Sequence, residues 1–429
     1  MVNKVVMLSL AGALLIAAAV PEKGRLRAGA ARVDITPAPN AALPLDGYGK
    51  FDQGSTGIHD HLYVRAIVVD DGTRQGAIVS CDLLYAEGEF WNKMIPRLTK
   101  ETGLPPESIL MVGTHTHGAP VVVGPIHDEF KQRWTEWRTQ LEDRVVEAVR
   151  QAKANLQPAK AGFGIGKAYV NTNRRAHLAS GGWGLGVNPE GPSDKTVSVV
   201  RFESLAGEPI AFLINYAVHG TCLGPENHEI TGDLPGATER LVEQHFGDKV
   251  VAAWSSAASG DQNPIYGPGI DYSPGGAFGR LLALGQILSE EVIRIAGKIQ
   301  TSPNAKIRAA QKTVTCAGQR LAPGSDADDN RVSFLDADAV NIRVSLLMVD
   351  NTALVGVSGE VLTLIGERLK RESPFSHTLM LTHCNGSVGY IPDDAAYAQA
   401  SYEVATSPVK SGCAESAIVN AALLLMDEY

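Results

Sequence analysis

The stretch GAIVSCDLLYAEGEFWNKMIPRLTKETGLPPESILMVGTHTH, residues 76–117, contains the pattern that decides the fold. Two apolar runs, 76–85 and 108–114, flank a helix-like segment, 89–103, which we expect Pro96 to interrupt. Strands that alternate with helices in this way predict parallel strands joined by right-handed crossovers. The stretch therefore predicts an α/β fold.

The same alternation continues along the chain and predicts a mixed sheet core with parallel strands and flanking helices, in a single domain. Further strands are expected at 65–69, 211–218, 250–255, 353–359 and 379–384, and helices at 133–156, 236–247, 275–299, 360–373 and 411–429. Two segments lack this pattern and are expected to be long loops. Residues 171–196 carry Arg174, Arg175 and Trp183 and are expected to be functional, whereas the Asp-rich segment 323–340 is expected to be a mobile connector.

Composition excludes several classes of protein. Of 429 residues, 44% are hydrophobic and 20% charged, which is typical of a soluble globular protein. Lys and Arg total 38 against 47 Asp and Glu, and this net charge of −9 argues against nucleic acid as a partner. The five cysteines form no CxxC pair, so disulfides are not expected to be the scaffold, and Cys81 and Cys222 are expected to be buried free thiols.

The N-terminus has the order of a secretory signal: Lys4, an apolar run from Val5 to Val20, and small residues at 17–19. The run is shorter than the ~20 residues that a membrane-spanning helix needs. We therefore expect residues 1–25 to be a signal peptide and the mature protein to be secreted or periplasmic.

The motif THTH provides the first candidate site. If the strand continues through it, His115 and His117 share one face at the carboxyl end of the strand, where open α/β sheets bind ligands. His219, Glu360 and Tyr390 follow other apolar runs. Two histidines and a carboxylate are a common catalytic zinc set. Each residue also has a structural interpretation: His219 as a core histidine, Glu360 as a first-turn helix residue and Tyr390 as a packing residue.

Eight motifs in chain order resemble the catalytic domain of the neutral/alkaline non-lysosomal ceramidases, from about Ala31 to the C-terminus. They are ARVDITPAP, TGIHDHLYVRA, GTHTHGAP, VNTNRRA, NYAVHGT, SGDQNP, SGEVLTLIGERLK and GYIPDDAAYAQASYE. In that family a zinc-bound water hydrolyses the amide of N-acylsphingosine. The resemblance implies an exported, zinc-dependent amidohydrolase of sphingolipid metabolism, with one catalytic domain at residues 26–429. Its substrate would be ceramide or a related small amide or N-acyl lipid, reached through peripheral contact with a membrane.

The resemblance also implies a role for each matching residue. Zn²⁺ would be held by His115, His219, Glu360 and Tyr390. The catalytic residues would be His117, Arg174 and Tyr402. Of these, His117 would shuttle a proton to the leaving amine, Arg174 would contact the substrate carbonyl, and Tyr402 would lie near the same site.

Two departures from the family pattern bear on the substrate. Asn263 stands where the ceramidases have a Ser that serves the active site, and is expected to contact the substrate. We also expect no C-terminal immunoglobulin-like domain, which in the family helps to complete the enzyme. Both departures predict an amide substrate other than ordinary ceramide.

Three other functional classes are compatible with a His-X-His motif or with the fold. The residues Gly-Ala-Pro after His117 exclude the His-X-His-X-Asp-His motif of metallo-β-lactamases. A barrel amidohydrolase is disfavoured because several strand–helix units precede His115. A non-catalytic lipid- or glycan-binding protein on the same fold remains the alternative, and the sequence assigns no oligomeric state.

Overall fold

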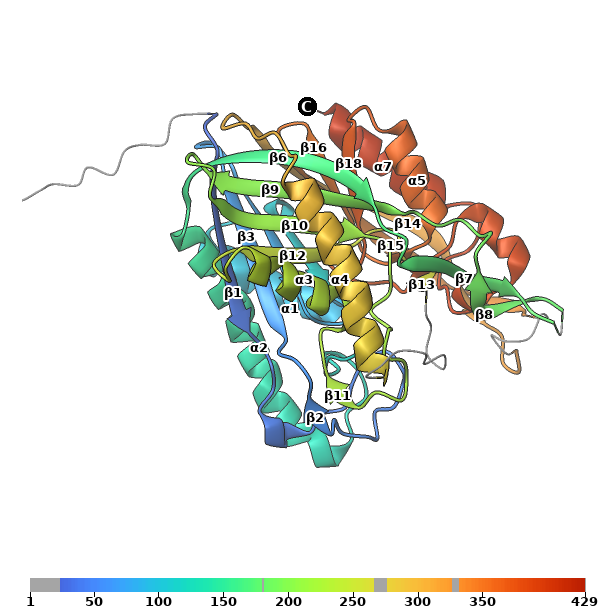
Figure 1. Ribbon diagram of the computed structural model, residues 1–429. Coiled ribbons are helices and arrows are strands. Elements are labelled where there is room, and N and C mark those ends of the chain that lie inside the picture. Colours follow the sequence, from blue (N-terminus) through green and yellow to red (C-terminus); the bar gives the residue numbers. More distant parts are fainter. Residues whose placement is uncertain (1–23, 180, 266–275, 326–331, 429) are drawn as a thin grey trace, which may run out of the picture.

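The computed structural model describes residues 24–179, 181–265, 276–325 and 332–428 (Figure 1). Nearly all of the expected signal peptide, residues 1–23, lies outside the described residues. In the part of the chain that is described, no helix is both long and apolar enough to cross a membrane.

Three strand–helix–strand units, each with two parallel strands, form the framework. They are β4 (Gln75–Cys81), α1 (Gly88–Thr102) and β5 (Ile109–Gly113); β10 (Pro209–Tyr216), α3 (Asp233–His245) and β12 (Val251–Ser256); β16 (Thr352–Val357), α5 (Thr363–Glu372) and β18 (His377–Leu381). The α/β class with parallel strands is thus confirmed.

One expectation about these units was wrong. Pro96 lies inside α1 and does not interrupt it. A proline within a helix costs about 3 kcal/mol. The apolar face of α1, which buries Phe90, Trp91, Met94 and Leu98, offsets that cost by packing on the sheet.

The strands of these units belong to two larger sheets. One has the order β12-β10-β9-β6-β1-β3-β4-β5 and the other β14-β15-β16-β18. The additional strands are β1 (Arg27–Asp34), β3 (Tyr63–Asp70), β6 (Gln157–Lys167), β9 (Thr196–Ser204), β14 (Ile307–Leu321) and β15 (Phe334–Val349). One core is shared by both halves of the larger sheet and by the smaller sheet, and contains Ile67, Ile78, Leu110, Val200, Leu213, Val251, Leu347, Leu354 and Leu379.

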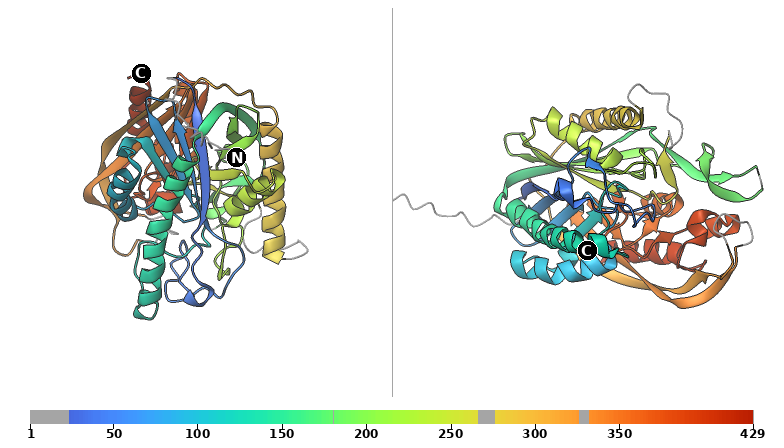
Figure 2. Two further views of the ribbon diagram at one scale, coloured as in Figure 1. Left: turned by 90° about the vertical axis from the view of Figure 1, so that its left-hand side faces the viewer. Right: turned by 90° about the horizontal axis from the view of Figure 1, so that it is seen from below.

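Helices cover the outer faces of these sheets. The long α2 (Asp128–Ala154) and α1 pack on one side, and α3 with α4 (Gly276–Ala296) on the other, so that α2 and α4 lie on opposite sides of the strands (Figure 2). The smaller sheet is covered by α5 and α7 (Ala414–Asp427). Because helices cover the faces of both sheets, the ends of the strands are the places where a functional site can form.

The two expected loops contain strands. Residues 171–196 include β7 (Asn171–His177) and β8 (Trp183–Asn188), and β7 also pairs with β13 (Gln262–Pro264). In the segment 323–340, residues from Phe334 onward belong to β15, while 326–331 lie outside the described residues. The first half of β15 is mostly exposed, so it lacks the apolar alternation by which a strand is recognised.

The remaining elements are short and lie mainly at the strand ends. They are β2 (Gly57–Ile58), β11 (Glu229–Ile230), β17 (Glu360–Val361), β19 (Tyr390–Ile391), α6 (Tyr402–Ala405) and the 3₁₀ turns η1 (Pro39–Ala41), η2 (Pro106–Ser108) and η3 (Asp394–Gln399).

Two cysteines form a disulfide and three are free. Cys316 in β14 is bonded to Cys413, which directly precedes α7. Cys81 and Cys222 are buried free thiols, which confirms the expectation for them, and Cys384 is a third. The disulfide therefore fastens the last helix to the smaller sheet.

Candidate metal centre and active site

The candidate site lies at the carboxyl ends of the three parallel strand pairs. His115 follows β5, His219 follows β10, and His383 follows β18. Glu360 forms β17 after β16 and pairs in register with Tyr390 of β19. Glu360 therefore lies in a short strand and not at a helix start, because α5 begins only at Thr363.

A turn, and not a continued strand, brings His115 and His117 together. β5 ends at Gly113, and His115 has a φ of 67°, in the left-handed region that β-strands exclude. The two rings nevertheless lie with their centroids 5.1 Å apart. The expected proximity holds, but the expected strand geometry was wrong.

The four residues expected to hold a metal lie together. Nε2 of His115 is 3.6 Å, and Nε2 of His219 is 3.5 Å, from Oε2 of Glu360. The ring centroids of the two histidines are 4.4 Å apart. Tyr390 is the strand partner of Glu360.

Neighbouring groups fix the orientation of these side chains. Nδ1 of His115 lies 3.1 Å from the carbonyl oxygen of Leu84, and Nδ1 of His219 lies 3.0 Å from that of Ser259. Because a carbonyl only accepts, each Nδ1 carries the proton and each Nε2 keeps its lone pair. The Tyr85 hydroxyl donates to Oε1 of Glu360 at 2.6 Å, which leaves Oε2 to the site. Such outer contacts are typical of metal ligands.

Several buried polar atoms at this site have no hydrogen-bond partner within the described chain. They are Nε2 of His115, Oε2 of Glu360, and both ring nitrogens of His117 and of His383. Buried polar atoms are almost always satisfied, so a cluster of exceptions points to a missing partner. Within it, His115, His117 and His219, and likewise His115, Glu360 and His383, offer ligand atoms that all lie within 4.8 Å of one another.

The charge state of the imidazoles also fits a metal. Burial lowers the pKa of His115 and places the pKa of His117, His219 and His383 well below the usual range. The rings are therefore neutral at pH 7, which is the form that binds metals. Imidazole with carboxylate suits zinc and related transition metals.

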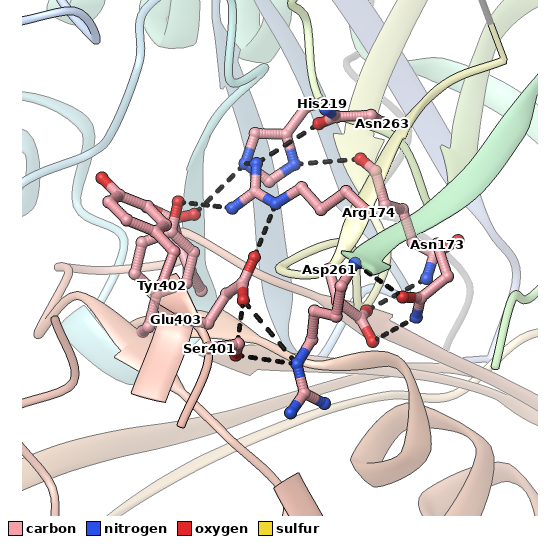
Figure 3. Close-up of polar contacts among 12 residues, drawn as sticks. Asn173, Arg174, His219, Asp261, Asn263, Ser401, Tyr402 and Glu403 are labelled. Carbon is pink, nitrogen blue, oxygen red and sulfur yellow. Dashed lines mark hydrogen bonds and ion pairs between the residues drawn. The ribbon is translucent and has the colours of Figure 1, made fainter. Parts of the chain in front are cut away.

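Arg174 lies beside this cluster and connects its parts (Figure 3). Nη2 donates to the Tyr390 hydroxyl at 2.9 Å, and Nη1 lies 3.0 Å from Nε2 of His219. Nη1 also donates to Oδ1 of Asn263 at 3.3 Å. The guanidinium carbon lies 6.0 Å from the Tyr402 ring centroid. Arg174, Asn263 and Tyr402, which the sequence predicts as site residues, thus lie next to one another.

Glu403 is a site residue that the sequence reasoning missed. Fully buried, it accepts from Nε of Arg174 at 2.7 Å and lies 3.7 Å from Nε of Arg175 (Figure 3). Ser401 joins the pair, since it accepts from Arg175 and donates to Glu403. Burial alone would lower the pKa of Arg174, but Tyr390, Glu403 and Glu360 outweigh it and raise that pKa. The available signal was the pair of adjacent arginines, Arg174 and Arg175, in a segment expected to be functional, since two such cations in a site call for a carboxylate partner.

His117 lies in a tight enclosure at the edge of the cluster. Its ring centroid is 4.8 Å from that of Tyr48. A Cβ atom on Gly47 would lie only 2.1 Å from Nδ1 of His117, so the ring rests directly on the glycine backbone. Neither ring nitrogen is engaged by the described residues, which leaves His117 able to exchange a proton with a bound molecule.

Comparison with known proteins finds one family. The model of the neutral/alkaline non-lysosomal ceramidase N-terminal region matches residues 26–273, more than half of the chain. Neutral ceramidase A of Dictyostelium discoideum is 27% identical in an alignment of 256 residues that covers 54% of this chain and 35% of that protein. Neutral ceramidase of Pseudomonas aeruginosa is 27% identical in an alignment of 262 residues that covers 56% of this chain and 37% of the relative. The matches thus span only about a third of these relatives.

Solved structures share the fold over nearly the whole chain. The neutral ceramidase from Pseudomonas aeruginosa superimposes with a TM-score of 0.74 at 18% identity, covering 95% of this chain and 74% of that one. A structure described as ceramidase complexed with C2 gives the same TM-score and identity, with 94% and 76% covered. The shared architecture therefore extends well beyond residue 273.

Proposed function

The chain belongs to the neutral/alkaline non-lysosomal ceramidase family, and from that premise we propose that it is a zinc-dependent amidohydrolase that cleaves an N-acyl amide. The observation that carries the proposal is the cluster of unpartnered, buried ligand atoms beside the Arg174 guanidinium. That arrangement combines a metal-binding set with a fixed cation, and both favour amide hydrolysis by stabilising the developing oxyanion. Zinc would be held by His115, His219, Glu360 and Tyr390.

Zinc bound there would lower the pKa of a water molecule towards ~7 and polarise the amide carbonyl. Arg174 is already held by Glu403, Tyr390 and Asn263, so it presents its charge to the carbonyl oxygen without reorganising. Oxyanion stabilisation of this kind contributes roughly two to three powers of ten in rate. The Tyr402 ring lies near the same guanidinium, and would therefore lie beside the carbonyl group of the bound substrate.

Proton transfer is assigned to His117. Amide cleavage requires a proton on the leaving nitrogen, since an amine anion is too basic to depart. His117 has no ring nitrogen committed to another described residue and lies beside His115. It therefore accepts a proton from the attacking water and delivers it to the amine as the C–N bond breaks.

Asn263 supports an amide other than ordinary ceramide as the preferred substrate. Its carboxamide accepts a hydrogen bond from Arg174 and so occupies space beside the oxyanion donor. Unlike a serine, it has no hydroxyl proton to deliver. Asn263→Ser should raise ceramide hydrolysis if this side chain is the main obstacle.

The remaining proposals concern processing and location. We propose that residues 26–429 are the catalytic domain, that residues 1–25 are a signal peptide, and that the protein is secreted or periplasmic. The Cys316–Cys413 disulfide supports export, because disulfides persist mainly in oxidising compartments. Transient contact with a membrane surface would follow if the substrate is a lipid.

The central experiment measures metal content and amide cleavage on the same purified protein. The bound metal is identified by mass spectrometry, and a library of N-acyl amines that includes ceramide is screened for released amine. His115→Ala and His219→Ala should lose metal and activity together. His117→Ala and Arg174→Ala should keep the metal and lose about two powers of ten in turnover.

Matched controls lie outside the site. Arg201→Ala removes a partly buried arginine bound to Ala296, and His377→Ala removes a histidine packed on Phe163. Both should retain metal and turnover. Full metal occupancy in His115→Ala and His219→Ala would reject the ligand assignment. Metal binding with no amine released from any library member would instead indicate the alternative, a non-catalytic lipid- or glycan-binding protein.

A further inference from the structure

Tyr48 borders the candidate site, although neither the family motifs nor the sequence pattern assigns it a role. The segment that carries it is fixed beside the turn of the two histidines, because the Asp46 N–H donates to the carbonyl oxygen of Ala119, two residues after His117, at 2.9 Å. The ring of Tyr48 packs on that of His117, with centroids 4.8 Å apart and an angle of 50° between the planes. The phenol is therefore held next to the residue assigned to proton transfer.

The hydroxyl of Tyr48 is buried and has no hydrogen-bond partner among the described residues. Burial raises the pKa of this hydroxyl, so it keeps its proton at neutral pH and can both donate and accept a hydrogen bond. Buried polar groups are almost always paired, and leaving one unpaired destabilises the fold. A phenylalanine would pack on His117 equally well without that cost. The unpaired hydroxyl therefore indicates that Tyr48 contacts a bound molecule.

The position of Tyr48 indicates which part of a bound amide it would meet. In the proposed reaction Arg174 faces the carbonyl oxygen, and His117 delivers the proton to the leaving nitrogen. A group that packs on His117 therefore lies on the amine side of the bond that breaks. Tyr48 is also close to the cation of this site, since the charge of Arg174 partly opposes the rise in the pKa of its hydroxyl. The Tyr48 hydroxyl thus lies within reach of the amine portion of an amide bound at Arg174.

The chemistry of this position favours an uncharged polar group. Two residues away along the chain, burial raises the pKa of the Asp46 carboxyl to about 6, so the surroundings disfavour a negative charge. A hydroxyl is uncharged and can exchange a hydrogen bond with the phenol in either direction. We propose that Tyr48 is a substrate-binding residue whose hydroxyl hydrogen-bonds a hydroxyl group on the amine portion of the amide. This inference rests on the proposed amidohydrolase, and it makes Tyr48 the residue that selects N-acyl amino alcohols over N-acyl alkylamines.

The experiment compares two amides that differ at one group. An N-acylethanolamine carries a hydroxyl where the N-acylpropylamine carries a methyl, and both are made with the acyl chain that the library screen shows to be cleaved best. The value of kcat/KM is measured for each amide with the parent chain, Tyr48→Phe and the control Tyr63→Phe. Tyr63 is a half-buried tyrosine whose ring packs on Arg32 and Arg65. The parent should prefer the ethanolamide by about tenfold or more, Tyr63→Phe should keep this preference, and Tyr48→Phe should lose it.

The ratio of the two kcat/KM values within one protein does not depend on how much of that protein is folded. An equal or reversed preference in the parent, or the same preference in the parent and Tyr48→Phe, would overturn the role of Tyr48 while leaving the proposed enzyme intact. A loss of turnover that is equal for both amides would also overturn it, since Tyr48 would then act only by supporting the His117 ring. A parent that cleaves no amide in the library would overturn the proposed function as well.

Discussion

At the residue scale, Gly47 determines whether His117 can occupy its position. Gly47 has a φ of 94°, and an added Cβ would lie 2.1 Å from Nδ1 of His117. Gly47→Ala should therefore displace the imidazole, lower turnover by about two powers of ten and leave zinc content unchanged. Single-turnover kinetics with metal analysis would measure both.

Gly49 provides the control for that substitution. It also has a positive φ, 68°, but no atom lies within 4 Å of an added Cβ. Gly49→Ala should thus carry a similar backbone strain of about 1–2 kcal/mol without moving His117. An equal loss of turnover in both variants would show that strain, and not displacement of His117, is responsible.

Asp46 should make stability depend on pH. Burial raises the pKa of its carboxyl from 3.8 to about 6, although the Gly47 N–H partly opposes this. A raised pKa means that the carboxyl favours the folded state below pH 3.8, and that this contribution is lost as the pH rises through about 6. The free energy of unfolding should fall by roughly 3 kcal/mol across this pH range.

Asp46→Asn removes the titrating group and keeps an oxygen that can accept from Gly47. The variant should be more stable than the parent at pH 8, by up to about 3 kcal/mol, and this advantage should fall by about half at pH 5. Urea unfolding at the two pH values measures it. An advantage independent of pH would refute ionisation of Asp46 as the cause.

Most residues of the candidate site could be predicted from the sequence, because the ends of apolar strands can be recognised there. His115, His219, Glu360 and Tyr390 each follow an apolar run, and the structure brings them together. His383 follows the run Leu-Met-Leu in the same way, but the pattern alone does not distinguish it from Tyr390, which we predict as the site residue of that strand end. Glu403 could not be located by that rule, since it belongs to a short helix and becomes relevant only through its contacts with two arginines.

At the scale of elements, the Cys316–Cys413 disulfide should stabilise the attachment of α7. The bond closes a loop with a sequence separation of 97, for which chain-entropy arguments give up to about 4.7 kcal/mol. Removing it in a Cys316→Ser, Cys413→Ser double variant should cost about 2–5 kcal/mol in the free energy of unfolding. Thermal unfolding with and without dithiothreitol would measure the effect.

The double variant also serves as the control for effects of dithiothreitol that do not involve the disulfide. Dithiothreitol should lower the melting temperature of the parent to that of the double variant, and should not affect the variant itself. A reductant effect of equal size in both proteins would mean that the disulfide is not its target.

Periodicity predicted the elements that bury a regular apolar face and failed for those that do not. All three strand–helix–strand units were predicted, because their strands are apolar runs and their helices are amphipathic. The sequence predicts a loop at β7 because this strand consists mainly of polar residues. They are buried through hydrogen bonds to other parts of the chain, such as Asp261 and Glu403. The exposed half of β15 contributes too little to the core to produce a pattern.

At the scale of the whole molecule, zinc should bind only the folded chain. Its expected ligands are spread from His115 to Tyr390, and no unfolded segment gathers them. Free zinc at 100 times its dissociation constant should therefore add about 2.7 kcal/mol to stability and raise the melting temperature measurably over that of the chelator-treated protein. Calorimetry would detect this shift.

His115→Ala serves as the control for zinc linkage. With one expected ligand removed, the melting temperature should respond weakly or not at all to the same zinc concentration. If zinc stabilises this variant as much as the parent, the stabilising ion is bound elsewhere on the molecule.

The distribution of the site along the chain has a consequence for the time course of synthesis. Arg175, which directly follows Arg174, leaves the ribosome 228 residues before Glu403, the carboxylate that forms an ion pair with both arginines in the folded protein. At roughly 5–20 residues per second, that interval lasts on the order of 10–50 s. During it His115, His117 and the two arginines have been made, but His219, Glu360, Tyr390 and Glu403 have not all followed. If the chain is the amidohydrolase proposed above, a nascent chain cannot cleave an amide within the cell that makes it until nearly all of the chain has been translated.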